Sequence, residues 1–415
     1  MSDAQFMRLA LRLARRGCGT TSPNPMVGAV LVKGGKIIGR GWHRRAGGPH
    51  AEIEALRDAQ KHGQSAKGAT LYVTLEPCST HGRTPPCTQA IIAASIKRVV
   101  VGTTDPNPKH SGRAFKILRR AGIEIAWWGE TPSSPNQMTK KPGLERLSPH
   151  RDFADECARL NEAFNHWIVH RTPFVTVKAA MTLDGKIATA SGESKWITAE
   201  AARACAMTLR RGADAILVGV NTILADDPGL TFRPVQGPKS KVQSRKELRR
   251  IILDSNARTP LDAKIVSDKF AALTTIVVSK SAPKSRVAAL AKRVNVIVAP
   301  TIKVGRAVPS APLSARSENA LYQQIDLRWL LKKLGSESVT GLLVEGGGEV
   351  NASFLLGGLA RRVAFFYAPK ILGGRDSRKA VAGEGARSLA EVIQLRDVEW
   401  KRIGPDLLLT ARIAP

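Results

Sequence analysis

The chain has 415 residues, of which 43% are hydrophobic and 24% are charged. This balance excludes a disordered or fibrous protein, and the length exceeds what one hydrophobic core usually fills, so two domains are expected. Lysine and arginine number 64 against 34 acids. The resulting net charge of +30 favours anionic partners, namely nucleic acid, an acidic membrane face or phosphorylated small molecules.

Cysteine usage and hydropathy narrow the class further. The five cysteines are widely spaced and odd in number, which argues against a disulfide framework and predicts a reducing, cytoplasmic compartment. No apolar run reaches the length of about 18 residues that a membrane span needs. We therefore expect no membrane partner.

The first 126 residues alternate between helical and extended patterns. Residues 1–17 carry apolar side chains at helical spacing, and two apolar runs, Val27–Val32 and Ile37–Ile38, flank a glycine pair that predicts a hairpin. Further on we expect helices at about 50–61, 88–95 and 114–121, and strands at 70–75, 98–102 and 123–126. This alternation predicts an α/β sheet covered by helices on both faces.

A change in composition then divides the chain. Residues 131–150 contain four prolines and a Lys-Lys pair with little periodicity, which is typical of a linker. We therefore place one domain at 1–150, with 131–150 as its linker, and a second at 151–415. The second should begin with an amphipathic helix at 152–168. Its strands are expected at 174–179, 215–219, 250–254, 275–279, 294–298, 341–344 and 362–367.

A basic stretch, Gln236–Arg250, stands out within the second domain. It holds one acid, Glu247, and six basic residues: Lys239, Lys241, Arg245, Lys246, Arg249 and Arg250. Such a run is typical of a solvated insertion, and a dedicated nucleic-acid patch is the alternative.

One imidazole and two thiols in the first domain have the chemistry of a zinc site. His50 begins a predicted helix, Cys78 follows a strand and Cys87 begins another helix. Three such ligands suit Zn²⁺ and leave a fourth position for water, as in catalytic sites. Glu52 lies two residues from His50, where a carboxyl group reaches that water without being a ligand. We predict a hydrolytic metal centre with Glu52 as the proton carrier.

The number of residues between the two cysteines differs from that in the zinc deaminases that act on nucleobases. Zinc deaminases that act on nucleobases carry His-x-Glu followed by Pro-Cys-x-x-Cys. Here eight residues, Ser79–Pro86, separate Cys78 from Cys87. Any one of these cysteines or His50 alone is an ordinary buried residue, so the prediction depends on the whole set. Cys18, Cys157 and Cys205 lack such neighbours and are expected to be small core residues.

The longer motifs of the first half resemble, very specifically, the deaminase half of the bifunctional riboflavin deaminase/reductase family. The resemblance lies in Glu76–Cys87, Pro23–Gly28 and Asp105–Pro108. It implies a cytidine-deaminase-like three-layer αβα domain with one zinc ion bound by His50, Cys78 and Cys87. The implied substrate is 2,5-diamino-6-(ribosylamino)pyrimidinone 5′-phosphate, with Glu52 as catalytic proton shuttle and Asn24 holding the pyrimidine.

The second half resembles the reductase half of the same family. Its motifs are Lys178–Lys186, Ser191–Thr198, Thr222–Pro228 and Leu230–Arg233. Val344–Glu349 is glycine-rich at a strand-to-helix turn, which suits a phosphate, but it lacks the Gly-x-Gly-x-x-Gly form, so a Rossmann domain is not predicted. The resemblance implies a dihydrofolate-reductase-like α/β domain that uses NADPH.

This resemblance also assigns residues to the reductase site. The cofactor contacts it implies are Ala180, Trp196, Thr222, Asp226, Ser255, Gly347, Gly348, Glu349, Val350, Asn351, Ala352 and Ser353. The substrate contacts it implies are Ser194, Arg210, Leu230, Arg233 and Glu345, and Lys178 is a candidate for handling the ribose beside Glu345. A guanidinium fork suits a sugar phosphate, although Arg210 is otherwise an ordinary solvated helix charge and Trp196 an ordinary core residue.

The expected function is therefore deamination followed by reduction of the ribosyl group to ribityl, giving 5-amino-6-(5-phosphoribitylamino)uracil. A nucleic-acid deaminase with a basic binding domain is the main rival, but it explains neither the eight-residue gap nor the second set of motifs. A zinc-stabilised scaffold is the third class, and Glu52 argues against it. No nucleic-acid partner is predicted. The sequence leaves open a homo-oligomer, channelling between sites, and the role of segments 131–150, 236–248 and 300–322.

Overall fold

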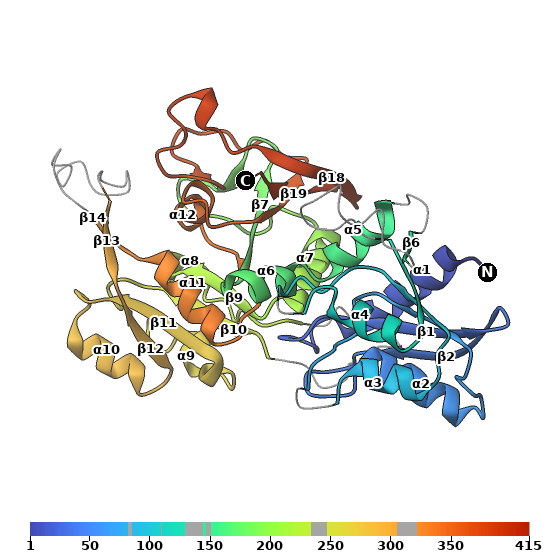
Figure 1. Cartoon of the computed structure of the whole chain (residues 1–415). Coiled ribbons are helices and arrows are strands. Elements are labelled where there is room, and N and C mark those ends of the chain that lie inside the picture. Colours follow the sequence, from blue (N-terminus) through green and yellow to red (C-terminus); the bar gives the residue numbers. More distant parts are fainter. Residues whose placement is uncertain are drawn as a thin grey trace. The chain divides into compact units, whose positions relative to one another are not determined.

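The computed structural model describes residues 1–81, 85–108, 110–128, 144–146, 151–233, 247–304 and 322–414. The chain divides into two compact units, Met1–Arg171 and Thr172–Pro415 (Figure 1). The predicted linker and insertions fall mostly outside the described residues, which include only 144–146 of the first, 247–248 of the second and 300–304 with 322 of the third.

The first unit is built on one sheet. Its helices are α1 (Asp3–Ala14), α2 (Ala51–Lys61), α3 (Cys87–Ala93), α4 (Arg113–Arg120), α5 (Arg151–Leu160) and α6 (Glu162–His170). Its strands are β1 (Gly28–Lys33), β2 (Lys36–Trp42), β3 (Thr70–Val73), β4 (Arg98–Val101), β5 (Glu124–Trp127) and β6 (Leu144–Arg146). Among the described residues the strand order is β2-β1-β3-β4-β5-β6, with β1 antiparallel to both neighbours and β3 to β6 parallel.

Helices cover both faces of this sheet, as predicted. Apolar residues of α2, α3 and α4 pack on one face with Leu31, Leu71 and Val99. Residues of α1 and α5 pack on the other face with Val30 and Val100. Alternate strand residues thus point into different cores, and the three layers of a cytidine-deaminase-like αβα domain are confirmed.

Two expectations at the end of this unit are corrected. The helix predicted at 152–168 is two helices, because Asn161 leaves the helical conformation and its side chain bonds both the N–H and the carbonyl of Met26. The unit also ends at Arg171, later than the composition shift suggested. Phe153 and Cys157 of α5 belong to its core, and part of the predicted linker forms strand β6.

The second unit is built on a longer sheet. Its helices are α7 (Glu200–Gly212), α8 (Val220–Asp226), α9 (Lys264–Ser267), α10 (Lys284–Ala291), α11 (Leu327–Ser336) and α12 (Gly348–Leu356). Its strands are β7 (Phe174–Thr182), β8 (Lys186–Ala188), β9 (Ala215–Gly219), β10 (Arg249–Leu253), β11 (Thr274–Ser279), β12 (Asn295–Ala299), β13 (Thr301–Val304), β14 (Tyr322–Ile325), β15 (Gly341–Val344), β16 (Arg362–Ala368), β17 (Arg378–Lys379), β18 (Leu395–Ile403) and β19 (Asp406–Ile413). Single 3₁₀ turns occupy Arg15–Gly17 in the first unit and Ala271–Leu273 and Leu389–Glu391 in the second.

The strand order in the described part of this sheet is β12-β11-β10-β9-β15-β7-β16-β19-β18. The strands from β12 through β11, β10, β9, β15 and β7 to β16 run parallel, and β19 is antiparallel to both of its neighbours, β16 and β18. Strand β9 is buried throughout, with Ala215 and Leu217 facing the core under α11 and α12. Ile216 and Val218 face the opposite core, under α8, α9 and α10. All seven predicted strands are present, and the dihydrofolate-reductase-like α/β class is confirmed.

The carboxyl ends of the parallel strands lie along the same edge of the sheet, and ligands of open α/β sheets usually bind just beyond these ends. Ser255 and Glu345 each lie two residues or less beyond such an end, and Thr222 lies in α8, directly after β9. The hairpin β18–β19 was not predicted. Among the described residues no helix is both long and apolar enough to cross a bilayer.

Candidate active sites

Helix α2 carries two residues of the first site, and Gly41 of the neighbouring strand allows it to pack close to the sheet. His50 is the N-cap of α2, and Glu52 lies in its first turn. A Cβ atom on Gly41 of strand β2 would lie 2.2 Å from the carbonyl oxygen of Ala51. Only glycine therefore allows the start of α2 to approach the sheet this closely, which places His50 and Glu52 beside the ends of β3 and α3.

We expect Gly41→Ala to destabilise the first unit by about 1–3 kcal/mol, as overpacking of a core usually does. The shift of α2 should also lower zinc affinity, because it moves His50. Denaturant unfolding and metal titration check both effects. Gly212→Ala is the control, since a Cβ atom there meets nothing within 4 Å. Unchanged stability in Gly41→Ala would show that the backbone relaxes freely.

The three predicted metal ligands converge. His50 Nδ1 lies 3.4 Å from Cys78 Sγ and 3.3 Å from Cys87 Sγ, and the three ligand atoms lie within 4.8 Å of one another. Donors around a tetrahedral Zn²⁺ are about 3.5 Å apart, given metal–ligand bonds of about 2.0–2.3 Å. Both the donor types and their spacing therefore fit zinc. Residues 82–84 of the intervening segment lie outside the described residues.

The local electrostatics favour a thiolate at Cys78. Hydrogen bonds from the Cys87 thiol, from His50 and from the Cys87 N–H lower the pKa of Cys78 to about 4. The N–H of Cys87, the first residue of α3, lies 3.2 Å from Cys78 Sγ. A deprotonated thiol is the form that binds a metal.

Glu52 is the carboxyl group of this site, and it is 3% exposed. Burial, reinforced by the charge of Cys78, raises the pKa of Glu52 to about 7. A carboxyl group with this pKa both accepts and donates protons near neutrality, as a general acid–base catalyst must.

Two further residues support the site and were missed from sequence. His43 is buried, and its Nδ1–H donates to the carbonyl of Pro49 over 3.0 Å. The amide of Asn24 lies 3.3 Å from His43 Nε2, so its nitrogen donates there and its oxygen remains for a ligand.

Glu76 accepts three backbone N–H bonds from the segment Asp105–Ala114. Glu76 belongs to the quoted motif, but its anchoring role depends on contacts distant in sequence.

In the second unit, three of the sequence-predicted residues form one ion-pair cluster. Arg210 of α7 binds Glu345 through both carboxylate oxygens, at 2.8 and 3.0 Å. Lys178 of β7 lies 3.5 Å from the same carboxylate. Burial alone would raise the pKa of Glu345, but Lys178 and Arg210 outweigh burial and lower it to about 2. The structure thus joins two predicted substrate residues with the lysine proposed to handle the ribose.

The glycine-rich turn lies between β15 and α12. A Cβ atom on Gly346 would overlap Val350, and one on Gly348 would lie 2.3 Å from the carbonyl oxygen of Lys379, whereas one on Gly347 meets nothing within 4 Å. The turn is therefore closely packed except at Gly347, where its backbone is open to a ligand. Asn351 is fully buried and donates to the Ala380 carbonyl, so its side chain supports the turn from inside.

The other predicted cofactor residues are spread over several elements of the second unit. Trp196 is 67% exposed and stacks with Arg203, and Asp226 pairs with Lys195 at 3.4 Å. Ala180 lies in β7, Thr222 in α8, and Glu349, Val350, Ala352 and Ser353 in α12; the carbonyl of Ser255 accepts hydrogen bonds from Ser279. The alternative that Trp196 is an ordinary core residue is therefore wrong, because its side chain is exposed.

Of the remaining predicted substrate residues, Leu230 and Arg233 lie in the loop after α8, and Ser194 lies between β8 and α7. Leu230 is 3% exposed, Ser194 is partly buried and Arg233 is exposed. The carbonyl of Thr231 accepts a 2.9 Å hydrogen bond from Arg210. Among the described residues, no hydrogen bond or ion pair joins Ser194 or Arg233 to Glu345.

These two centres define an enzyme that combines a zinc-binding deaminase unit with a dihydrofolate-reductase-like unit. Residues 1–103 match the cytidine and deoxycytidylate deaminase zinc-binding region, and residues 173–409 match the RibD C-terminal domain. The chain therefore belongs to the RibD family, the bifunctional deaminase/reductase enzymes of riboflavin biosynthesis.

Relatives of this family match over nearly the whole chain. The chain is 42% identical to the riboflavin biosynthesis protein RibD of Aquifex aeolicus, covering 98% of this chain and 97% of that protein. It is 39% identical to the protein of the same name from Actinobacillus pleuropneumoniae, covering 99% and 95%. Among solved structures, Acinetobacter baumannii RibD matches with a TM-score of 0.77 and 31% identity, over 100% of this chain and 99% of that one.

Proposed function

We propose that the chain deaminates 2,5-diamino-6-(ribosylamino)pyrimidinone 5′-phosphate and then reduces the ribosyl group to ribityl with NADPH. The observation that carries the proposal is the convergence of His50, Cys78 and Cys87 beside buried Glu52, in a chain that also has a reductase unit. A Thermotoga maritima protein of 31% identity, described as a diaminohydroxyphosphoribosylaminopyrimidine deaminase/5-amino-6-(5-phosphoribosylamino)uracil reductase, supports these substrates; its structure matches 99% of this chain with a TM-score of 0.73.

In the deaminase half, the residues divide into ligands, a proton carrier and a substrate clamp. His50, Cys78 and Cys87 would hold one Zn²⁺, which when bound would lower the pKa of a water molecule to about 7. Glu52 carries two protons in turn: it takes the first from the attacking water and delivers it to the ring nitrogen, and it takes the second from the newly added hydroxyl and delivers it to the amine, which leaves as ammonia while the carbonyl forms. The oxygen of Asn24, whose amide nitrogen is engaged by His43, accepts from an amino group of the pyrimidine.

In the reductase half, NADPH supplies the hydride, and the protein supplies binding and orientation. The N–H groups at the start of α12 and the open backbone at Gly347 suit a phosphate of the cofactor. Trp196, Thr222, Asp226 and Ser255 are the further cofactor contacts that we propose.

Arg233 and the ion-pair cluster are proposed to hold the reductase substrate. Arg233 is exposed, and no described residue forms an ion pair with it, so its guanidinium is available for the sugar phosphate. Glu345 is held ionised and oriented by Arg210 and Lys178. An oriented carboxylate accepts a ribose hydroxyl, and Lys178 then lies beside the same sugar.

A coupled assay tests the proposal. Purified protein given the diaminopyrimidinone ribotide should release ammonia, and NADPH should then be consumed, with loss of absorbance at the nicotinamide band. An RNA substrate is the control and should remain intact. Ammonia release from RNA, or failure to oxidise NADPH when the deaminated ribotide is supplied, would contradict the proposal.

We further propose that the protein acts in the cytoplasm and that phosphorylated small molecules, not nucleic acid, are its anionic partners. The reducing cytoplasm keeps the thiols of Cys78 and Cys87 available for zinc. Both proposed ligands are phosphorylated, which gives part of the net charge of +30 a direct use.

We also propose a homo-oligomer that pairs through strand β18. This strand lies at the edge of the described sheet and exposes Trp400 by 59% and Val398 by 47%. A long edge strand with exposed apolar side chains favours pairing with a second copy. Trp400→Glu should then shift the native mass toward the monomer in light scattering, whereas Leu389→Glu, an exposed apolar position outside the strand, should not. An unchanged mass in Trp400→Glu would exclude this edge.

A further inference from the structure

Arg210 and Arg250 both form hydrogen bonds to the backbone of the loop after α8, which carries the proposed substrate residues Leu230 and Arg233. Arg210 donates from Nη1 to the carbonyl of Thr231 at 2.9 Å, and Arg250 donates from Nη1 to the carbonyl of Gly229 at 3.0 Å. Leu230, between them, has a φ of +47°, in the left-handed region that non-glycine residues seldom adopt. The backbone at Leu230 therefore depends on interactions that hold its two neighbours.

Arg250 is committed entirely to this structural network. Its side chain is 1% exposed, and it binds Asp268 through two parallel hydrogen bonds of 2.7 and 2.8 Å. Its remaining donors bind Thr274 Oγ1 at 2.9 Å and the carbonyl of Ile265 at 3.1 Å. Every N–H of the guanidinium thus has a protein acceptor. The expectation that Arg250 belongs to a solvated basic insertion is therefore wrong.

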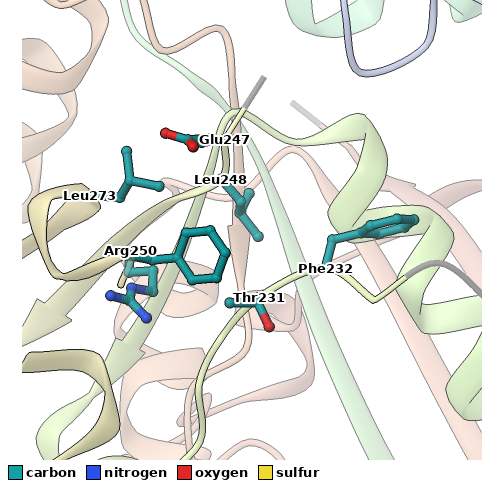
Figure 2. Close-up of a pocket in the computed structure, with 7 residues that line it drawn as sticks. Thr231, Phe232, Glu247, Leu248, Arg250 and Leu273 are labelled. Carbon is teal, nitrogen blue, oxygen red and sulfur yellow. The ribbon is translucent and has the colours of Figure 1, made fainter. Parts of the chain in front are cut away.

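Packing holds the side chain of Leu230, which belongs to the core cluster that contains Ile216 and Ile265, but it leaves space beside the two residues that follow. Thr231 and Phe232 line a cavity of about 260 Å³ together with Arg250, Phe270 and Leu273. Figure 2 shows Thr231, Phe232 and Arg250 on the wall of this cavity. Because apolar contacts leave space beside Thr231 and Phe232, the hydrogen bonds from Arg250 to Gly229 and from Arg210 to Thr231 restrain the backbone on either side of Leu230.

We propose that Arg250 is a positioning residue for the reductase reaction. It holds Gly229 so that Leu230 adopts its left-handed conformation and the following residues present Arg233 to the substrate, while Arg210 links Thr231 to Glu345. Arg250 acts through the loop and touches neither substrate nor cofactor. This inference depends on the proposed contact of Leu230 and Arg233 with the substrate.

Arg250→Met tests the inference, and Arg249→Met is its matched control. Arg249 is the preceding residue of β10, and it pairs with Glu337. In Arg250→Met we expect the KM for the deaminated ribotide to rise about tenfold, equivalent to about 1.4 kcal/mol. The KM for NADPH and the rate of ammonia release should stay within about twofold. Arg249→Met should leave all of these values at the wild-type level.

Two further variants keep the test informative if Arg250→Met folds poorly. Arg250→Met with Asp268→Asn removes the unpaired carboxylate, and Arg250→Lys keeps a cation that reaches fewer acceptors. Hydrogen exchange in peptides covering 228–233 should become faster in the double variant and return partly toward the wild-type rate in Arg250→Lys. The ribotide KM should follow the same order.

Arg233→Met separates this inference from the proposed function. If Arg233→Met raises the ribotide KM while a folded Arg250 variant does not, the positioning role is wrong and the substrate placement stands. If neither variant changes that KM, the substrate placement fails and the positioning role falls with it. A fall in kcat and in thermal stability with both KM values unchanged would mean that Arg250 serves stability only.

Discussion

Replacing Cys87 with alanine should abolish ammonia release and zinc retention while NADPH oxidation with the deaminated ribotide continues. The physical reason is that two of three ligands cannot complete the site, because Cys87 Sγ lies 3.3 Å from His50 Nδ1 within the cluster. We expect ammonia release to fall by at least about a thousandfold. The reductase residues lie in the other compact unit and keep their own core.

Glu52→Gln separates metal binding from proton transfer. Glutamine keeps the shape of the side chain, but its amide neither accepts nor releases a proton near neutral pH. Ammonia release should therefore fall by about 10²–10⁴-fold, the usual contribution of general acid–base catalysis. Zinc content should stay near one ion per chain, because Glu52 is outside the set of His50, Cys78 and Cys87.

Metal analysis of the purified variants and the ammonia assay check both results. Cys18→Ala is the matched cysteine control and should retain both zinc and activity, since Cys18 lies outside the metal cluster. Ammonia release that survives Cys87→Ala would contradict the zinc assignment. Zinc loss in Glu52→Gln would make that residue a ligand.

The sequence predicted the deaminase unit well because its signals are local. Short apolar runs located the strands, and His50, Glu52, Cys78 and Cys87 stand at helix starts or strand ends that the pattern reveals. The role of His43 was not predicted, because its partners Asn24 and Pro49 come from other segments. The break at Asn161 was also missed, since it depends on pairing with the distant backbone of Met26.

The reductase unit was predicted less completely. Strands such as β9 were visible because they are buried on both faces and read as apolar runs. Strand β18 is exposed along almost its whole length, so its sequence, Leu395–Ile403, shows no alternation that would mark it. Arg250 shows a further limit, because its charge in a basic stretch indicates solvent, and only the tertiary partners Asp268 and Thr274 make it a buried residue.

The cluster of Lys178, Arg210 and Glu345 shows how the two kinds of information combine. From sequence, Lys178 was proposed to act beside Glu345 and Arg210 was named separately; the structure adds that both cations bind the one carboxylate of Glu345. A buried carboxylate with two cations costs desolvation energy that a neutral core would avoid. Its presence at the carboxyl edge of the sheet therefore favours a functional role over a purely stabilising one.

Arg210→Met should lower kcat/KM of the reductase for the deaminated ribotide by about a hundredfold, equivalent to about 2.7 kcal/mol. It removes the two hydrogen bonds that Arg210 donates to Glu345 and the one that it donates to the Thr231 carbonyl, and leaves the contact from Lys178. Arg211→Met is the matched control, because Arg211 is the next residue of α7 and is exposed. Ammonia release should be unchanged in both. Equal reductase activity in the two variants would contradict a role for the Arg210–Glu345 pair.

Arg210→Met should also reduce how strongly the free energy of unfolding of the reductase unit falls as the pH is lowered from about 4.5 to 2. The pKa of Glu345 is about 2 in the folded chain against an ordinary 4.5, a difference worth about 3 kcal/mol. Because the folded value is depressed, this stabilisation is fully present above about pH 4.5 and is lost as the pH falls toward 2. Hydrogen exchange in β7 and β15 should therefore show a large difference between wild type and Arg210→Met at pH 6. That difference should shrink progressively below pH 4.5, and a difference independent of pH would mean that Arg210 stabilises the unit through packing instead of through the Glu345 charge.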